Sequence, residues 1–302
     1  MKRIVLLAIV FVLLQGLALA DGAFFPTEEQ WKQMRERSLI NEPEQKAVVF
    51  FSKGTEQLII SAGYEGSASD FAWVVPVPSR PKVEILKGAI FHELAKLVEP
   101  KRPTGRLSKS AQTMSAPGAV TVLERKTVGA YDVSVLSATD GQALMKWLKA
   151  NKYHLPEKAV GPMKSYAKQG WTFVASRIKV PSNSEGLRTG TLAPLRLTFK
   201  AKQPVYPMKL SSANPKAFSV LVYLVLPSGD IGGKPKEIDM RGWPDQWSTR
   251  WAATASGYAW NRRKYPTLAD LYNGEMQVYM QRCYAYPEDC TQDMVWRLPS
   301  GK

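Results

Sequence analysis

The nine residues "DFAWVVPVP" at positions 70–78 constrain the fold more than any other stretch of this chain. Successive side chains of a β-strand point to opposite faces of the sheet, so Phe71, Trp73 and Val75 share one face. The opposite face is apolar as well. A strand with two apolar faces is typical of a sheet that is covered on both sides. We therefore expect this strand to lie in the interior, between two layers of structure.

Two prolines end the stretch and restrict its place in a sheet. Pro76 and Pro78 have no backbone N–H, and alternate residues of a strand direct this group to the same edge. Because a complete ladder of hydrogen bonds cannot form along that edge, we predict that the strand ends a sheet or lies at its border. The prolines would then also protect it from pairing with other chains.

The rest of the chain combines strand patterns with helical ones. A hairpin is predicted around the turn at Lys53-Gly54, and a helix is predicted to begin at Thr27, with Gln30 completing a capping box. Such blocks predict an α+β fold with mostly antiparallel sheets and packed helices, in a single domain over residues 21–302. Within it, residues 99–118 are predicted to form a mobile loop, and residues 240–302 a helical, aromatic-rich C-terminal part.

Residues 1–20 have the three parts of a secretory signal peptide. Two basic residues come before an apolar run at 4–14, and Ala18 and Ala20 place small residues at a cleavage site. A membrane anchor needs about 20 apolar residues, and this run is too short. We therefore expect the mature chain to begin at Asp21, to be periplasmic or secreted, and not to be an integral membrane protein.

The charge of the chain restricts its partners. The formal net charge is +15, from 41 basic and 26 acidic residues. A basic exported protein encounters anionic lipid surfaces and acidic polymers of the cell envelope, which are therefore the predicted partners. Nucleic acid matches the charge but not the compartment, so it is not predicted as a partner.

Cys283 and Cys290 are the two cysteines of the chain. Export favours a disulfide between them, because exported proteins meet an oxidising environment. The alternative is a redox or metal pair, which needs closer spacing or further ligands, and only His92 and His154 could add imidazoles. We predict the disulfide, with neither a metal nor a cofactor.

Three acidic residues flank the ends of predicted strands: Glu65, Asp70 and Asp132. Two carboxylates that lie close together can act as general acid and base, so these residues are candidate catalytic groups of a hydrolase. The alternative for Asp70 is structural, because an aspartate at a turn accepts hydrogen bonds from backbone N–H groups. The structural interpretation of Asp70 is the one we favour.

One stretch approaches a metal motif without completing it. "FHELAK" at 91–96 begins as the zinc-binding pattern H-E-x-x-H, but Lys96 occupies the place of the second histidine. His92 lies opposite the apolar stripe of its predicted helix, so we expect it to face solvent. The nucleophile turn G-x-S-x-G is absent from the sequence.

Aromatic and basic residues are interleaved near the C-terminus. The residues concerned are Trp243, Trp247, Trp251, Trp260, Arg262 and Arg263. The first three tryptophans are four residues apart and would form one stripe of a helix. Such a stripe is either a packing face or a surface on which rings stack on sugars while cations meet acidic groups. It is the predicted surface for an acidic envelope polymer or an anionic lipid surface.

Four stretches resemble, in order and spacing, a bacterial exported family known only as domain-of-unknown-function family 2330. They are "YEGSASDFAWVVPVPSRP", "VGAYDVSVLSATDGQALMKWLKANKYHLP", "YAKQGWTFVASRIKV" and "LAPLRLTFKAKQPVYPMKL". The resemblance implies an exported bacterial protein and no known activity or catalytic residue. Many members begin their mature chain with a cysteine-containing segment, whereas this chain has "DGAFFP" there. Any role of those cysteines therefore does not carry over.

These observations favour a non-catalytic binding or structural module of the bacterial cell envelope over an enzyme. The alternative is a hydrolase of envelope material that uses carboxylates near Glu65, Asp70 and Asp132. An exposed aromatic stripe beside Arg262 and Arg263 would favour binding, and buried carboxylates clustered in a cleft would favour the enzyme.

Overall fold

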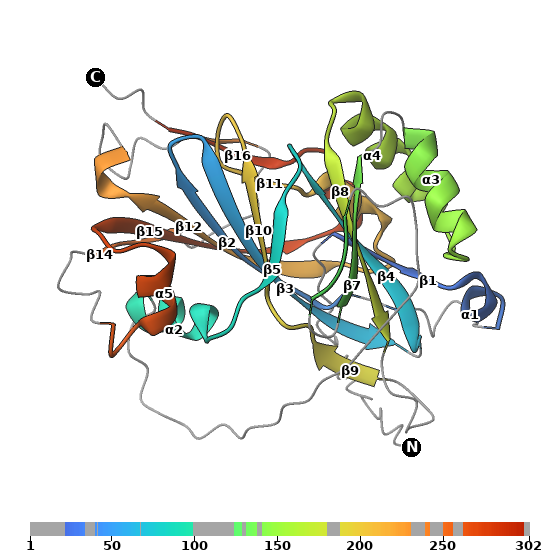
Figure 1. Ribbon diagram of the computed structural model, residues 1–302, viewed down its shortest axis with the longest axis horizontal. Helices are drawn as coiled ribbons and strands as arrows, with labels where there is room; N and C mark the ends of the chain where they lie inside the picture. The colour runs from blue at the N-terminus through green and yellow to red at the C-terminus, as the bar shows by residue number, and fades with distance from the viewer. Residues whose placement is uncertain are drawn as a thin grey trace, which may run out of the picture.

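The computed structural model describes residues 22–33, 40, 42–66, 68–98, 124–128, 131–137, 141–179, 188–230, 239–241, 250–255 and 262–298. Two large β-sheets pack against each other through a shared hydrophobic core, and helices cover the outer face of each sheet (Figure 1). The predicted α+β class with mostly antiparallel sheets is confirmed. The predicted loop at 99–118 lies outside the described residues.

The first sheet has five strands, all paired antiparallel. In spatial order they are β1 (Ala23–Pro26), β4 (Asp70–Val77), β8 (Thr172–Lys179), β7 (Tyr131–Ser137) and β6 (Glu124–Val128).

The second sheet has eight strands, and β9 (Arg188–Thr191) joins it only through β3. The others follow in the order β14 (Arg250–Ala255), β15 (Met276–Ala285), β12 (Phe218–Pro227), β2 (Glu44–Ser52), β3 (Thr55–Gly66), β10 (Leu195–Lys200) and β5 (Lys82–Ile85). The pair β12–β2 is parallel, and the other described pairs of this sheet are antiparallel.

A small sheet and several short helices complete the described fold. The small sheet contains β11 (Val205–Tyr206), β16 (Met294–Arg297) and β13 (Asp239–Arg241). The α-helices are α1 (Glu28–Gln33), α2 (Ile90–Val98), α3 (Gly141–Ala150), α4 (Glu157–Lys168) and α5 (Pro266–Leu271). The 3₁₀ helices are η2 (Lys209–Ala213), η3 (Ser228–Asp230) and η5 (Pro287–Asp289). No described helix is long and apolar enough to cross a membrane.

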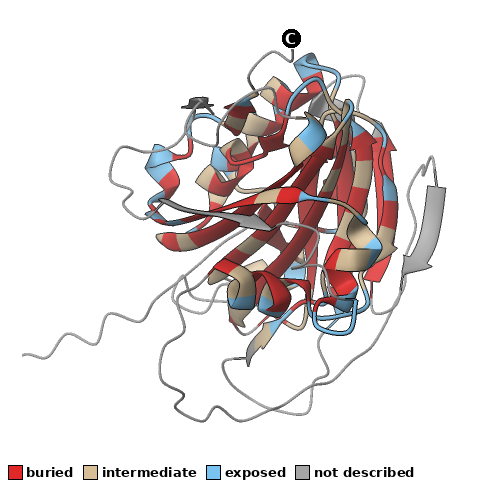
Figure 2. Ribbon diagram, turned by 90° about the vertical axis from the view of Figure 1, so that its left-hand side faces the viewer, coloured by how far each residue is buried: buried red, intermediate tan, exposed pale blue. Residues whose placement is uncertain are grey.

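Three clusters of buried apolar side chains hold these layers together. The largest lies between the two sheets and includes Trp73 from the first sheet and Leu58 from the second. A second cluster joins the outer face of the first sheet to α3 and α4, and a third joins the outer face of the second sheet to α2 and α5. Figure 2 shows buried strands through the middle of the molecule, with helices at its sides that expose one face.

The strand β4 confirms the prediction that both of its faces are covered. Phe71 and Trp73 are fully buried between the sheets, and Ala72 on the other face packs toward α3 and α4. Its predicted place at a border is correct for only half of its length. β1 pairs with β4 as far as Val74, and beyond that point the described residues pair with β4 only through β8, which reaches Val77.

Local turn and cap chemistry also gave correct predictions. Lys53 and Gly54 both have positive φ angles, 46° and 71°, as a tight two-residue hairpin turn requires. The side chain of Thr27 accepts a hydrogen bond from the backbone N–H of Gln30 at 3.3 Å, which caps α1. The Gln30 side chain contacts Ser69 Oγ at 2.9 Å, so the second half of the predicted capping box is not formed. Local hydrogen bonding therefore fixes these elements where the sequence placed them.

The prediction of a helical C-terminal part is wrong. Residues 240–302 contribute the strands β13, β14, β15 and β16 and, among their described residues, one short α-helix, α5. Trp251 lies in β14, which pairs with β15, so a helical stripe through Trp243, Trp247 and Trp251 is not formed. Strand pairing with β15 therefore prevails over the four-residue spacing of these tryptophans, because it is set by residues distant in the chain.

Candidate functional site

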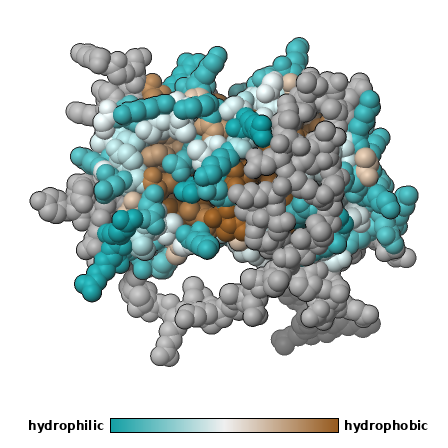
Figure 3. All heavy atoms as spheres, viewed as in Figure 1, coloured by the Kyte–Doolittle hydropathy of each residue, from teal (hydrophilic) through white to brown (hydrophobic). Residues whose placement is uncertain are grey.

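A cavity of about 270 Å³ opens on the outer face of the second sheet, beside α2 and α5. Ile59 and Ile90, both buried, and Leu271 give it apolar walls, while Lys87 and Arg196 bring positive charge to it. Figure 3 shows a hydrophobic area near the middle of this face, over the strands of the second sheet, with hydrophilic side chains around and across it. An apolar hollow with a few converging charges is the usual form of a small-molecule site.

Strand register places Arg196 at the cavity. In β10, Arg196 stands opposite Ile59 of β3 on one side and Glu84 of β5 on the other, so all three side chains share the outer face. Arg196 Nη2 donates to Glu84 Oε2 at 3.0 Å, while its buried Nε has no hydrogen-bond partner among the described residues. The guanidinium is therefore held in place, and its Nε–H is a buried donor without a partner among the described residues.

Glu84 is neutralised from two sides. Lys82 Nζ lies 2.9 Å from Glu84 Oε1, and this hydrogen bond is the main reason that the pKa of Glu84 is lowered. Burial opposes the shift, and the charge of Arg196 adds to it. Since one carboxylate faces two cations here, the surroundings of the cavity keep an excess of positive charge.

The helical wall of the cavity is fixed by a buried acid. Glu93 of α2 accepts hydrogen bonds from the backbone N–H groups of Thr267 (3.1 Å) and Leu268 (2.9 Å), and from the Thr267 hydroxyl (2.7 Å). It therefore caps the N-terminus of α5, where anionic groups are stabilised. The Thr267 hydroxyl also accepts from the Ala89 N–H at 3.2 Å, which ties the start of α2 to α5.

Gly88 allows this close approach of the two helices. Its φ angle is +118°, and a Cβ atom there would lie 2.3 Å from the Thr267 hydroxyl. The stretch "FHELAK" is thus explained without a metal, because Glu93 is the cap and His92 is exposed, as we expected. Sequence reasoning missed the cap, although an acidic residue on the apolar side of an amphipathic helix was its signal.

The basic end of the predicted aromatic–basic surface reaches the rim of the cavity. Arg262 forms an ion pair through its Nη2 with Oδ1 of Asp270, which lines the cavity, and both side chains are largely exposed. Arg263 is exposed as well. Trp243, Trp247 and Trp260 lie outside the described residues, and for Trp251 the structure describes only the strand to which it belongs.

The predicted carboxylates meet in part. Asp70 accepts a two-pronged contact from Arg177, with Nε 3.0 Å from Oδ1 and Nη2 2.5 Å from Oδ2, and Asp132 stands directly opposite Arg177 on β7. Glu65 lies on β3, in the second sheet, opposite Thr189. Among the described residues, the oxygens of Asp70 accept from the guanidinium of the neighbouring strand, a different partner from the backbone N–H groups that we expected.

The two cysteines are free thiols in the structure, so the predicted disulfide is not present in it. Cys283 lies in β15 and faces the core between the sheets, while Cys290 follows η5 and contacts the Tyr286 carbonyl at 3.4 Å. Burial is the main cause that raises the pKa of Cys283, and it raises that of Cys290 to about 12.

The histidines do not point to a metal centre. Within the described ranges, no group of three or more His, Cys, Asp or Glu residues is placed to hold a metal ion. His154 stacks on Trp31, with ring centroids 3.7 Å apart, and burial lowers its pKa against the opposing effect of Glu28. Both observations describe packing of α1 against the end of α3.

Comparison with known proteins adds a family and no activity. A model of the family described as "Uncharacterized protein conserved in bacteria (DUF2330)" matches residues 33–295. No curated protein sequence matches the chain. The chain is similar to a crystal structure of baculovirus P35. The match covers 86% of this chain and 91% of the P35 chain, at 9% sequence identity and a TM-score of 0.38. A likeness at that score supports no inference about this chain.

Proposed function

Since the chain belongs to the bacterial family of uncharacterized proteins DUF2330, which supplies no activity, we propose a function from the cavity: it binds a small organic anion with an apolar body. The observation that carries this proposal is the buried, unpartnered Nε of Arg196 beside apolar walls. A carboxylate at this point would accept from Arg196 while its hydrocarbon part covers Ile59 and Ile90. The hydrocarbon contact removes apolar surface from water, and the carboxylate satisfies the buried donor of Arg196.

The charge around the cavity supports an anionic ligand. Lys87, Arg196 and Arg262, which line the cavity or reach its rim, stand against two acids, Glu84 and Asp270. Lys87 is exposed and has no ion-pair partner in the described part of the chain, so its charge is available to a ligand. A site with an excess of cations attracts anions from a distance and holds them by charge-assisted hydrogen bonds.

The hydrolase alternative receives less support. Arg177 occupies the oxygens of Asp70 and stands opposite Asp132, so both carboxylates face the same cation. Glu65 lies in the other sheet. A general base needs an oxygen within reach of a substrate proton, and Asp70 offers its oxygens to Arg177 instead. We therefore propose binding rather than catalysis.

The place of action is proposed to be outside the cytoplasm, in the cell envelope. The support is the signal-peptide pattern of residues 1–20 and the net charge of +15. Protein from the envelope or periplasmic fraction should begin at Asp21 when its N-terminus is sequenced, because the leader is cleaved after Ala20. Protein that retains Met1 would contradict this expectation. An acidic polymer or anionic lipid surface as partner of residues 243–264 also stays a proposal.

The ligand proposal is tested by calorimetry with a matched pair of compounds. We expect 4-methylpentanoate to bind, and its neutral analogue 4-methylpentanamide to bind more weakly, because only the carboxylate pairs with the cations. Arg196→Gln should weaken carboxylate binding by about tenfold to a hundredfold, the usual value of a charge-assisted hydrogen bond. Lys87→Gln should weaken it less, since that side chain is exposed.

Lys82→Gln is the control for net charge, because Lys82 also bonds Glu84 but does not line the cavity. It should bind 4-methylpentanoate nearly as the unaltered protein does. The proposal fails if acid and amide bind equally, if neither binds, or if Lys82→Gln is as damaging as Arg196→Gln.

A further inference from the structure

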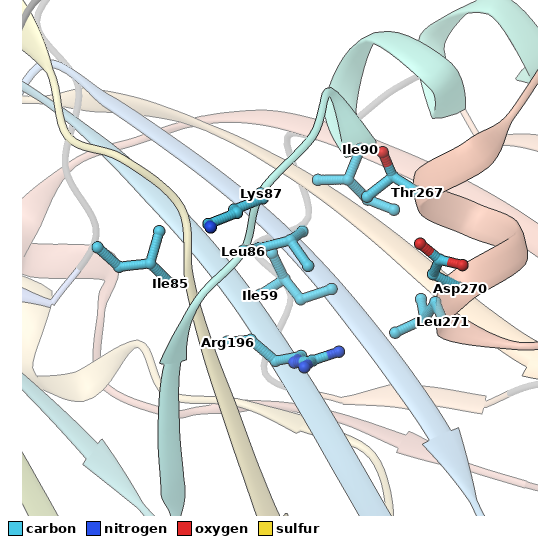
Figure 4. Close-up of a pocket in the computed structure, with 9 residues that line it drawn as sticks. All are labelled: Ile59, Ile85, Leu86, Lys87, Ile90, Arg196, Thr267, Asp270 and Leu271. Atoms are coloured by element: carbon cyan, nitrogen blue, oxygen red, sulfur yellow. The ribbon is translucent and has the colours of Figure 1, made fainter. Parts of the chain in front are cut away.

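The cavity carries a negative group as well as its cations, and the two are on opposite sides. Figure 4 shows Asp270 on the α5 side, Arg196 and Lys87 on the opposite side, and apolar side chains between them. From this arrangement, and resting on the function proposed above, we infer that the ligand is a small zwitterion: an apolar body with one ammonium and one carboxylate group. A free apolar amino acid and a short apolar peptide both have this chemistry.

Asp270 has an oxygen to offer to an ammonium group. Arg262 pairs through its Nη2 with Oδ1, and Oδ2 has no hydrogen-bond partner among the residues described. The Asp270 side chain is 65% exposed, so this carboxylate is accessible. An ammonium donating to Oδ2 would form a charge-assisted hydrogen bond.

The opposite wall selects the carboxylate. Arg196 presents its unpartnered Nε, and Lys87 adds an unpaired cation, whereas no cation of this wall is near enough to Asp270 to form an ion pair with it. A ligand with two negative groups would place one of them against Asp270, and a ligand with two positive groups would place one against Arg196. Like charges at close range are disfavoured, so the two walls together specify opposite charges at the two ends of the ligand.

The volume and the apolar walls limit what joins the two charges. The cavity measures about 270 Å³, just below the usual range for ligand sites, so it accepts a compact body rather than a long chain. Ile59 and Ile90 are almost fully buried and form part of its inner surface. A branched aliphatic side chain such as that of leucine matches these walls, while a polar one would lose its hydrogen bonds to water without replacement.

The inference is tested by adding an ammonium group to the ligand already used. Leucine is 4-methylpentanoate with an amino group at position 2, and the peptide Leu-Ala differs from N-acetyl-Leu-Ala in the same respect. In calorimetry with the full mature protein, leucine or Leu-Ala should bind about fivefold or more tightly than its partner without the ammonium group. A gain in affinity for leucine over 4-methylpentanoate indicates a free amino acid as the ligand. A gain for Leu-Ala over N-acetyl-Leu-Ala indicates a peptide.

Asp270→Asn should abolish this gain while 4-methylpentanoate binds as well as before, because the asparagine keeps the shape but not the charge. Glu275→Gln, an exposed acid just after α5, is the matched control and should keep the gain. Arg262→Gln should keep it too, since Arg262 competes for Asp270. If 4-methylpentanoate binds but neither zwitterion gains over its partner, or if the gain survives Asp270→Asn, the inference is overturned and the proposed anion site stands. If no compound binds, both fail.

Discussion

Trp73→Ala is expected to lower the free energy of unfolding by about 3–5 kcal/mol, the usual cost of removing a large buried aromatic side chain. Trp73 is fully buried in the core between the two sheets, and it packs near Phe24 of β1. Its removal would leave a cavity that β-strands fixed on both sides cannot close. Urea denaturation, followed by far-ultraviolet circular dichroism, measures this loss.

Trp31→Ala is the matched control, since Trp31 lies in the short helix α1 and is only partly buried. It should cost far less stability than Trp73→Ala. A Trp73→Ala protein with an unchanged unfolding midpoint would contradict the two-sheet core.

Asp293→Ala should be comparably damaging, at about 3–5 kcal/mol, because it removes one partner of a buried ion pair. Asp293 Oδ1 accepts from the Met208 N–H at 2.9 Å and from the Tyr166 hydroxyl, and Oδ2 lies 2.9 Å from Lys209 Nζ. Only 8% of the Asp293 side chain is exposed. Burial and the charge of Asp293 raise the pKa of Tyr166, which therefore stays a neutral donor. The network holds the start of β16 against α4 and η2.

Two further variants separate the parts of this effect. Asp293→Asn keeps an acceptor for Met208 and should cost less than the alanine variant, while Asp289→Ala, at an exposed position nearby, should cost almost nothing. Equal stability of the Asp293→Ala and Asp289→Ala proteins in the same denaturation assay would show that the network does not hold the C-terminal strand.

Elements set by local chemistry could be predicted from the sequence. The strand β4 was predicted from its two apolar faces. The hairpin turn was predicted from Lys53-Gly54, where both residues adopt positive φ angles. The helix α2 followed from its amphipathic pattern, and its apolar residues Ile90, Leu94 and Val98 are buried. In each case the neighbours that decide the structure lie within a few residues along the chain.

The C-terminal part could not be predicted in the same way. β15 does alternate near its end, where Arg282 and Tyr284 are exposed and Cys283 is buried, but residues 278–281 are buried on both faces of the sheet. A strand of that kind and a buried helix share the same apolar composition. The spacing of the tryptophans favoured a helix, whereas Trp251 lies in the strand β14 because this segment pairs with β15.

The cavity was beyond sequence reasoning for a related reason. Its walls come from β3, β10, β5 with the segment after it, α2 and α5. These elements meet only because β10 lies between β3 and β5 and because Glu93 docks α5 on α2. The predicted carboxylates illustrate the same limit, since Asp70 and Arg177 are 107 residues apart in the chain. Conversely, Arg262 was singled out for a different surface and proved to lie at the rim of this cavity.

The most direct test of the account locates the ligand by methyl NMR of isoleucine-labelled protein titrated with 4-methylpentanoate. Ile59 and Ile60 are neighbours on β3, but Ile59 faces the cavity side of the sheet and Ile60 the core between the sheets. Binding in the cavity should cause saturable shifts of the Ile59 and Ile90 methyl signals, with those of Ile60 and Ile178 unchanged. Shifts that are equal at all four residues, or absent at Ile59 and Ile90 when the ligand is saturating, would contradict a binding site between α2, α5 and β10.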